Sequence, residues 1–418
     1  MRPRMGILPS ESPGRETFRL DTIRAMPAGC METLSITFAV MIAERFFGAP
    51  DWAKAWLVAA PPLGLFLSLF LVQMVRKSGW SVNVTVAAIW GVSALCLVLA
   101  SLGADSMEMY LFAVGVGLMG TTLAVPLLAQ VYRRHYPGVN RGRLFAMSGV
   151  VRKLAAISVA ISFGWVLRQE LSSFRWLLLV YAAAYLWMAA CVYWMERVYL
   201  ERTERVKFFS AFSHVKRDRA FRNLLISWMI LGFGNLLCFS LFVEYVSNPE
   251  YGYDLDELTI ATITGVIPEV MFLFFVVGWG VIFDRMNFFL VRAVINVLFA
   301  MGILFYFVGD GVWALCVGIA FHGIARAGGN VAWSLWVTKF AKGAHVAEYM
   351  SVHTFLTGSR GIVAPFVAFP LVSSQGPETV GVIGAGLIII ATFMILPSVR
   401  WKAETRAKET VDPDPRVL

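Results

Sequence analysis

The chain has 418 residues, of which 58% are hydrophobic and 15% are charged, and its mean hydropathy is +0.68. A water-soluble protein of this size needs more polar surface, so the composition excludes that class. Taken alone, the net charge of +9 would suggest a nucleic-acid partner. The distribution of the basic residues along the chain indicates membrane topology instead.

Twelve apolar segments are long enough to cross a bilayer, which takes about 18 or more residues. We expect transmembrane helices at residues 26–47, 52–75, 81–103, 107–132, 143–168, 172–196, 221–246, 257–283, 287–309, 312–338, 347–374 and 378–399. The predicted parts are a cytoplasmic lead (1–25), six spans (26–196), a central loop (197–220), six further spans (221–399) and a cytoplasmic tail (400–418). The lead has no apolar core of a signal peptide, and we expect both lead and tail to be disordered.

Basic residues are divided unevenly between the two sets of loops. With both termini in the cytoplasm, most of the 36 Lys and Arg fall in cytoplasmic segments, and the outer loops hold only Arg45, Lys54, Arg168 and Arg175. This distribution follows the positive-inside rule. We therefore expect a multi-pass protein of a bacterial inner membrane, with both termini cytoplasmic and no nucleic-acid partner.

The five cysteines all fall within predicted spans, and the sequence has no CxxC, HExxH or GxSxG motif. Buried thiols that pack as small hydrophobic groups are the simplest interpretation. We expect no metal, no cofactor and no enzymatic activity.

The two halves of the chain echo each other at residues 127–157 and 334–364. Each stretch has an aromatic and basic helix exit, a short basic loop, an AMS or YMS triplet and then an embedded arginine, Arg152 or Arg360. A duplication of this kind is typical of transporters built from two parallel repeats.

The stretch GWGVIFDRMN, residues 278–287, carries the most specific local motif. It resembles the loop motif G-x-x-x-D-R-x-G of the major facilitator superfamily at Gly280, Asp284 and Arg285, with Asn287 where glycine is usual. The resemblance implies two pseudo-symmetric six-helix bundles that expose a central site alternately to the two sides. It also implies that Gly280, Asp284 and Arg285 form a conformational latch.

The marks of several subfamilies are absent. The first-half counterpart of the loop motif, VQMVRKSGW, keeps Arg76, Lys77 and Gly79 but has no acid. The fifth span lacks the Gly-Pro pattern of drug/proton antiporters, and the first lacks the acidic-acidic-Arg motif of peptide symporters. The subfamily therefore stays open.

Several charges lie deep in predicted spans. A residue twelve to fourteen positions into a helix is about 18–21 Å from its end, which places Glu269, Arg326 and Arg360 near the bilayer middle. An unpaired arginine there costs about 3–17 kcal/mol. An ion pair between Glu269 and Arg152 is one explanation, and it leaves Arg326 and Arg360 without an obvious carboxylate. Buried positive charge of this kind favours an anionic solute.

One face of the tenth span combines polar and charged groups. His322, Arg326 and Asn330 follow at intervals of four residues, and Trp333 lies lower on the same helix. This face is suited to bind a polar ligand, and the alternative is a hydrogen-bonded cluster between helices. The resemblance implies that the first, fourth, seventh and tenth spans line the cavity, which adds Asn235 and Gln130 as candidate substrate contacts.

Coupling to an ion gradient needs a group that changes charge. Glu269, Glu32 and His353 are candidates, because burial raises a carboxyl pKa and histidine titrates near neutrality. We identify Arg152 as the basic group of a salt bridge among them. Protons are the expected coupling ion.

We therefore expect a monomeric secondary active transporter that moves a small organic anion by proton-coupled alternating access, with membrane lipid around it. The first alternative is efflux of lipophilic compounds or drugs, which would fit an apolar cavity with its arginines in salt bridges. The second alternative is a membrane sensor or membrane-embedded enzyme.

Overall fold

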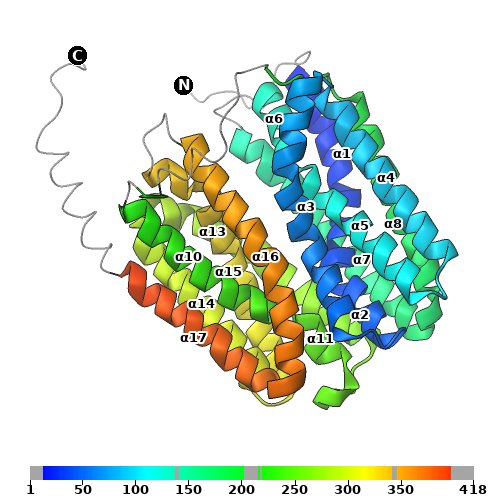
Figure 1. Cartoon of the computed structure of the whole chain (residues 1–418), viewed down its shortest axis with the longest axis vertical. Coiled ribbons are helices and arrows are strands. Elements are labelled where there is room, and N and C mark those ends of the chain that lie inside the picture. Colours follow the sequence, from blue (N-terminus) through cyan, green and yellow to red (C-terminus); the bar gives the residue numbers. More distant parts are fainter. Residues whose placement is uncertain (1–12, 137–140, 202–214, 217–218, 341–345, 397–418) are drawn as a thin grey trace, which may run out of the picture. The chain divides into compact units, whose positions relative to one another are not determined.

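The computed structural model describes residues 13–136, 141–201, 215–216, 219–340 and 346–396. Within these residues the structure is helical, with an isolated antiparallel bridge between Ser81 and Tyr199 and no strand (Figure 1). Twelve helical segments are long and apolar enough to cross a membrane. The predicted fold class, an all-α polytopic membrane protein, is confirmed.

Most spans consist of one helix, and a few are broken into two. The helices up to residue 194 are α1 (Pro13–Thr33), α2 (Ala39–Arg45), α3 (Asp51–Ser78), α4 (Val82–Leu102), α5 (Met107–Leu123), α6 (Val125–His135), α7 (Arg141–Gln169) and α8 (Phe174–Trp194). The later helices are α10 (Arg219–Phe239), α11 (Phe242–Ser247), α12 (Glu257–Ala261), α13 (Ile267–Arg285), α14 (Phe288–Val308), α15 (Gly311–Phe340), α16 (Val346–Gln375) and α17 (Pro377–Ile395). Successive spans cross the membrane in opposite directions. We call the side on which the first span begins the near face, and the opposite side the far face.

Two spans contain a five-residue π-helical turn. Leu34–Phe38 separates α1 from α2, and Thr262–Val266 separates α12 from α13. The Oγ1 atoms of Thr37 and Thr264 lie 3.1 Å apart and join the two turns. π-turns of this kind are frequent at functional sites, because they displace the side chains around them.

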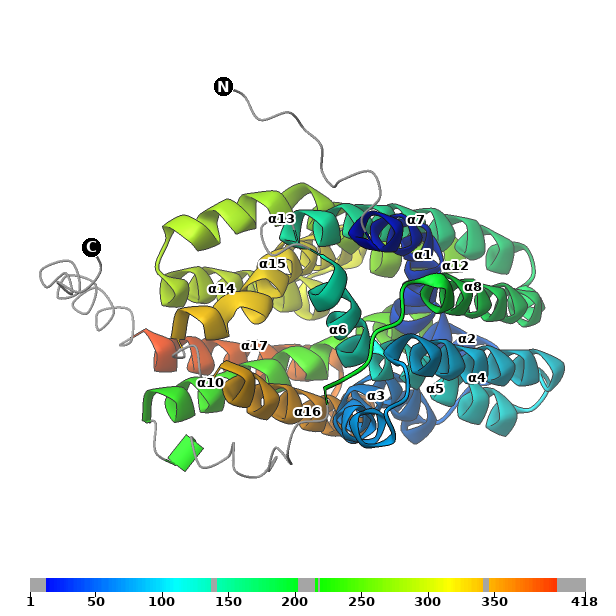
Figure 2. The same ribbon diagram turned by 90° about the horizontal axis from the view of Figure 1, so that it is seen from above.

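The chain forms two compact units. Unit 1 comprises residues 1–206, 240–269 and 361–373, and unit 2 comprises residues 207–239, 270–360 and 374–418. In unit 1, α4 packs on α8 and α5, α3 on α5, and α1 on α7; in unit 2, α14 packs on α15 and α17, and α10 on α17. Figures 1 and 2 show α4 beside α8 and α14 beside α17.

The unit boundaries fall inside three spans, so residues 240–269 and 361–373 of the second half pack in unit 1. The sequence domains at 26–196 and 221–399 divide the chain differently, and their boundaries stay a prediction.

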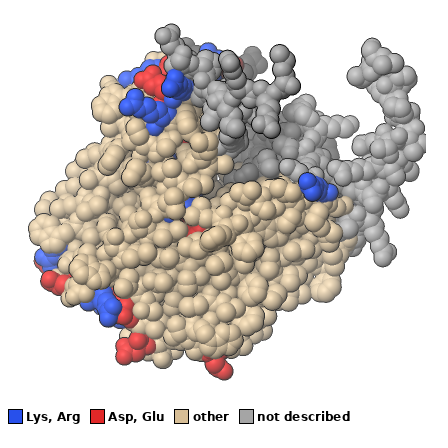
Figure 3. Space-filling model, turned by 180° about the vertical axis from the view of Figure 1, so that it is seen from behind, with Lys and Arg blue, Asp and Glu red and all other residues tan. Residues whose placement is uncertain are grey.

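The outward surface of both units carries large apolar side chains. Phe70 and Phe112 in unit 1 are 63% and 66% exposed, and Phe274 and Phe393 in unit 2 are 77% and 66% exposed. Figure 3 shows most of the charged side chains near the edges of the surface drawn, and the remaining area is tan apart from a few charged atoms near its centre. This distribution suits a surface that faces lipid.

The first helix begins earlier than expected. Residues 13–25 are helical, so the prediction of a disordered lead is wrong for this part of it. The reason is a buried acid: Asp21 lies 2.6 Å from Arg24 Nη2 and accepts hydrogen bonds from Tyr132 and Tyr136. We call Asp21, Arg24, Tyr132 and Tyr136 the near-face cluster. Residues 1–12, the centre of the loop at 202–214 and the tail from 397 lie outside the described residues.

The packing of α14 on α15 makes a direct prediction. A Cβ at Gly318 would stand 2.6 Å from Tyr306 N and 2.7 Å from Gly302 O, so the two backbones touch there. Gly318→Ala should destabilise the protein by about 1–3 kcal/mol, seen as a lower melting temperature in detergent. Gly278→Ala is the matched control, because a Cβ there meets nothing within 4 Å. Equal melting temperatures for the two variants would contradict this packing.

Candidate functional site

A buried lysine in unit 1 stands between two carboxylates. The Nζ of Lys153, on α7, is 2.5 Å from Glu32 Oε1 and 2.7 Å from Glu269 Oε2. Lys153 and Glu269 are only 4% and 2% exposed, and Arg152 Nε lies 3.7 Å from Glu32 Oε2. We call these four residues the Lys153 network. The expected partner of Glu269 was Arg152, and the structure places the neighbouring lysine there instead.

Local structure explains how Lys153 reaches both acids. Glu32 lies just before the first π-turn and Glu269 just after the second, on helices that approach α7 closely. A Cβ at Gly29 would stand 2.1 Å from Arg152 O, and one at Gly265 would stand 3.2 Å from the Ala160 Cβ. Small residues on both sides of α7 therefore bring the two acids within reach of one side chain.

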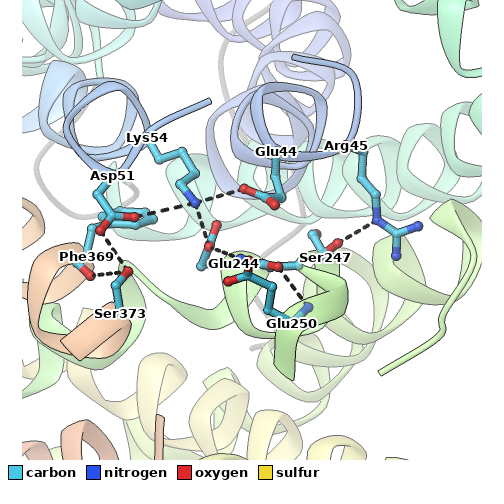
Figure 4. A network of polar contacts seen from close by, with 10 residues as sticks. Glu44, Arg45, Asp51, Lys54, Glu244, Ser247, Glu250, Phe369 and Ser373 are labelled. Carbon is cyan, nitrogen blue, oxygen red and sulfur yellow. Dashed lines mark hydrogen bonds and ion pairs between the residues drawn. The ribbon is translucent and has the colours of Figure 1, made fainter. Parts of the chain in front are cut away.

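A second lysine network lies at the far face of unit 1 (Figure 4). Lys54 Nζ is 2.8 Å from Glu44 Oε2, 2.6 Å from Glu244 Oε1 and 3.7 Å from Asp51 Oδ1. Asn248 Nδ2 donates to Glu244 at 3.1 Å. Lys54 and Glu244 are 3% and 1% exposed, so these charges are shielded from solvent. We call Glu44, Asp51, Lys54 and Glu244 the far-face network.

Arg45 extends the far-face network along the chain. Its Nε donates to Ser247 O at 2.6 Å and its Nη2 to Leu255 O at 2.7 Å, and Nη1 lies 3.8 Å from Glu257 (Figure 4 shows the Ser247 bond). Asp256 caps α12, and the Thr259 N–H that it accepts lowers the pKa of this carboxyl. The loop after α11 is thereby held to α2 within unit 1.

Unit 2 contains a buried cluster of two arginines around a tryptophan. Arg292 Cζ lies 4.7 Å above the Trp228 ring, Arg360 Nη1 donates to Trp228 O, and the His353 ring meets the same indole edge-on at 4.6 Å. Arg292 is 5% exposed and Arg360 half-buried. We call Trp228, Arg292, His353 and Arg360 the Arg–Trp cluster.

The two arginines of this cluster have no acidic partner in the described part of the chain. No carboxylate of those residues lies within ion-pair distance, and both Nε atoms are buried without a hydrogen bond. A Cβ at Gly232 would stand 2.1 Å from Arg360 Cζ, so glycine is required where the guanidinium passes α10. The cluster is a concentration of positive charge with free donors.

The polar face of the tenth span lies in aromatic surroundings. His322 is 3% exposed, stacks on Phe239 at 5.9 Å and meets Phe299 edge-on at 5.1 Å. Arg326 Cζ lies 5.6 Å above the Phe272 ring, and Asn330 is exposed. The ligand role of this face stays a prediction, as does the alternative of a packed cluster.

The remaining predicted residues are spread over both units. Asn235 is half-buried in α10, with its Oδ1 lacking a hydrogen bond, and Gln130 lines a cavity at the near face of unit 1. Arg285 is exposed, and a Cβ at Gly280 would meet nothing within 4 Å. The side chains of Asp284 and Trp333 lie outside the described residues, so the latch stays a prediction.

Sequence reasoning missed three central residues. Lys153 was not among the predicted site residues, because Arg152 beside it was taken as the partner of Glu269, and Lys54 was counted with an outer loop. Arg292 lies inside the predicted span at 287–309, as the fifth residue of α14, but was not among the predicted site residues. The available signal was the charge of Arg292 itself, which follows the apolar stretch FFLV inside a predicted span.

The comparisons with known proteins agree on one family. A family model described as Major Facilitator Superfamily matches residues 25–365, and no curated protein sequence matches the chain. The nucleoside transporter NupG has a similar structure, with 15% identity, a TM-score of 0.71, and coverage of 93% of this chain and 99% of its own.

Two further solved structures share the fold. A D-xylose-proton symporter is 14% identical with a TM-score of 0.67, covering 91% of this chain and 97% of its own. The human organic anion transporter MFSD10 is 15% identical with a TM-score of 0.60, covering 92% and 100%. With a family model that spans most of its length, and with twelve membrane-crossing helices, the chain belongs to the major facilitator superfamily and is a transporter rather than an enzyme.

Proposed function

We propose that this transporter moves a small organic anion across a bacterial inner membrane by proton-coupled alternating access, with both termini in the cytoplasm. The observation that carries the anion is the Arg–Trp cluster, in which Arg292 is buried and Arg360 half-buried, and neither has an acidic partner among the described residues. Among proteins of similar fold, one is described as an organic anion transporter and another as a proton symporter.

Two like charges, the guanidinium groups of Arg292 and Arg360, lie in one cluster, and their free-energy cost favours binding of an anion. Each unpaired guanidinium in a membrane interior costs at least about 3 kcal/mol, and a second one nearby adds repulsion. A carboxylate or phosphate would neutralise both, because guanidinium groups bind such anions through paired N–H donors. The Trp228 ring provides a flat surface for an apolar or aromatic part of the solute. Arg326 and Asn330 remain further candidate contacts.

The Lys153 network supports proton coupling. Its two carboxylates and two basic groups balance formally, so a proton on Glu32 or Glu269 leaves one positive charge in excess. Lys153 would then be held by one acid instead of two, and α7 would be freer to move relative to α1 and α13. A proton would thus both change the charge of the transporter and loosen the contact that fixes these helices.

The far-face network supports alternating access. Lys54 connects the start of α3 to Glu244 on α11, and opening the far face requires these charges to separate. The proposed latch at Gly280, Asp284 and Arg285 would have the corresponding role at the near face.

The anion hypothesis predicts a specific ligand profile. Purified protein should be stabilised against thermal unfolding by some organic carboxylates or phosphate esters, and not by neutral sugars or hydrophobic cations. Arg292→Gln and Arg360→Gln should weaken that binding by about 2–5 kcal/mol, or at least thirtyfold, because each removes one partner of a buried charge pair. Arg219→Gln, at an exposed position on α10, is the control. Stabilisation by hydrophobic cations alone would favour efflux of lipophilic compounds instead.

Proton coupling predicts a split between two transport modes. In proteoliposomes, an imposed pH gradient should drive accumulation of the stabilising anion by the wild-type protein. Glu269→Gln or Glu32→Gln should abolish this accumulation and leave exchange of labelled for unlabelled solute, because the site no longer binds a proton. Glu378→Gln, at an exposed position of α17, should behave as wild type. Gradient-driven accumulation that persists in both network variants would exclude the Lys153 network as the coupling site.

The far-face network predicts a change in accessibility. Ser247 is fully buried, so a cysteine there should react slowly with a membrane-impermeant maleimide. Lys54→Met leaves Glu44 and Glu244 buried without their base, which costs about 3–5 kcal/mol, and labelling should become more than tenfold faster. Lys77→Met is the control, and a cysteine at the buried Ala94 should stay unreactive if the protein opens rather than unfolds. Unchanged labelling at position 247 would show that the network does not hold the far face closed.

A further inference from the structure

A basic cavity of about 630 Å³ opens at the near face of unit 1. Its polar lining consists of Arg76, Gln130, Arg133, Arg134, Arg197 and Glu201. These side chains include four guanidinium groups and one carboxylate, so the cavity has a positive electrostatic potential. None of these residues belongs to the Lys153 network, the far-face network or the Arg–Trp cluster.

One lining segment of the cavity, around Val198, is bonded to the start of α4. Val82 N donates to Val198 O at 2.9 Å, and Val198 N donates to Asn83 Oδ1 at 2.9 Å. Asn83 Nδ2 donates in turn to Val192 O at 3.2 Å. These bonds hold the segment after α8 in place, so the backbone at Arg197 has a fixed position beside the cavity.

Arg76, in the lining of this cavity, has an unsatisfied donor. Its Nε is buried without a hydrogen-bond partner, and the loop that contains Arg76 and Lys77 has no acid, unlike the stretch with Asp284 in the second half. An unpaired buried guanidinium N–H is costly, and an anion from outside the chain would satisfy it.

An apolar groove of about 540 Å³ begins within a few residues of Arg76. It runs between α3, α4 and α5, and its lining includes Leu71, Met74, Trp80, Val84, Val92 and Leu123. Met74 precedes Arg76 by two residues and Trp80 follows it by four. The lining of the groove is almost entirely apolar. It includes residues of α4 from Val84 to Val92, a stretch of helix about 12 Å long.

Exposed aromatic side chains mark the depth of this region in the membrane. Trp80, Trp194 and Tyr199 are 54%, 67% and 62% exposed, and all three lie at the near-face ends of their helices or in the segment that follows. Exposed tryptophan and tyrosine concentrate at the boundary between headgroups and acyl chains. The basic cavity is thus at headgroup level. The groove reaches the same level at Trp80, and its lining follows α4 to Val92, toward the membrane interior.

We propose that this part of unit 1 binds one anionic phospholipid, with its phosphate in the basic cavity and an acyl chain in the apolar groove. The charge of the cavity selects an anionic headgroup, and the groove selects a lipid over a free anion. Basic residues near a membrane surface each strengthen binding of anionic lipid by about 1 kcal/mol, or about fivefold. The bound lipid would supply the negative charge that the Arg76 loop lacks.

The test compares lipids on the purified full chain in neutral detergent. Native mass spectrometry should show retention of dioleoyl phosphatidylglycerol over dioleoyl phosphatidylcholine. Arg76→Gln combined with Arg134→Gln should weaken phosphatidylglycerol binding about 25-fold. Lys77→Gln combined with Arg219→Gln removes two exposed near-face charges outside the cavity and is the matched control. An equal loss in the control pair would mean general charge attraction and would overturn the site.

The groove is tested separately from the cavity. Ala88 lines the groove and is exposed, so Ala88→Phe should occupy the acyl-chain position without disturbing the core, and phosphatidylglycerol binding should fall. Ala183→Phe, at an exposed position on α8, is the control. Two results would overturn the lipid proposal: displacement of phosphatidylglycerol by inorganic phosphate at millimolar concentration, or equal retention of phosphatidylcholine. Melting temperatures of all variants establish that each remains folded.

Discussion

The structure depends on the cost of holding an ionised side chain away from water. A buried charge persists only where a partner or hydrogen bonds replace its hydration. In unit 1, the near-face cluster, the Lys153 network and the far-face network each meet this requirement with an acid beside a base. In unit 2, the contacts of Arg292 and Arg360 within the described part of the chain are an indole ring and a backbone carbonyl, with no acid. This difference is the basis for proposing that the paired charges organise the protein and that the arginines of unit 2 bind a solute.

The ion pairs of unit 1 specify contacts more than they add stability. Desolvation of two charges roughly cancels their attraction, whereas removal of one partner is strongly unfavourable. Lys153 and Lys54 each join segments that are far apart in the sequence, and each has two close acids. An ion pair of this kind adds little net stability, but leaving one of its charges unpaired is costly. It therefore specifies one conformation of a transporter and still allows the protein to leave that conformation.

Hydropathy alone predicted the twelve spans well, because the bilayer requires continuous apolar helices whatever the tertiary structure. The span at Glu257–Phe283 has the predicted bounds. The predicted start of α1 was wrong because Asp21 and Arg24 pair with each other and form hydrogen bonds with tyrosines more than a hundred residues later, which no local pattern reveals. The choice of Lys153 rather than Arg152 beside Glu269 likewise depends on helix rotation, which one sequence does not determine.

Depth explains why arginine has two different roles in this chain. Arg134 and Arg197 are exposed at the near face, where water hydrates a guanidinium when no anion is bound, so binding there is exchangeable and tolerant of headgroup structure. Arg292, at 5% exposure, has no such alternative, and its state without a ligand is costly. A site that is costly when empty gains most from a ligand that fits closely. The interfacial arginines are therefore suited to a lipid selected by charge, and the buried pair to a solute selected by shape as well.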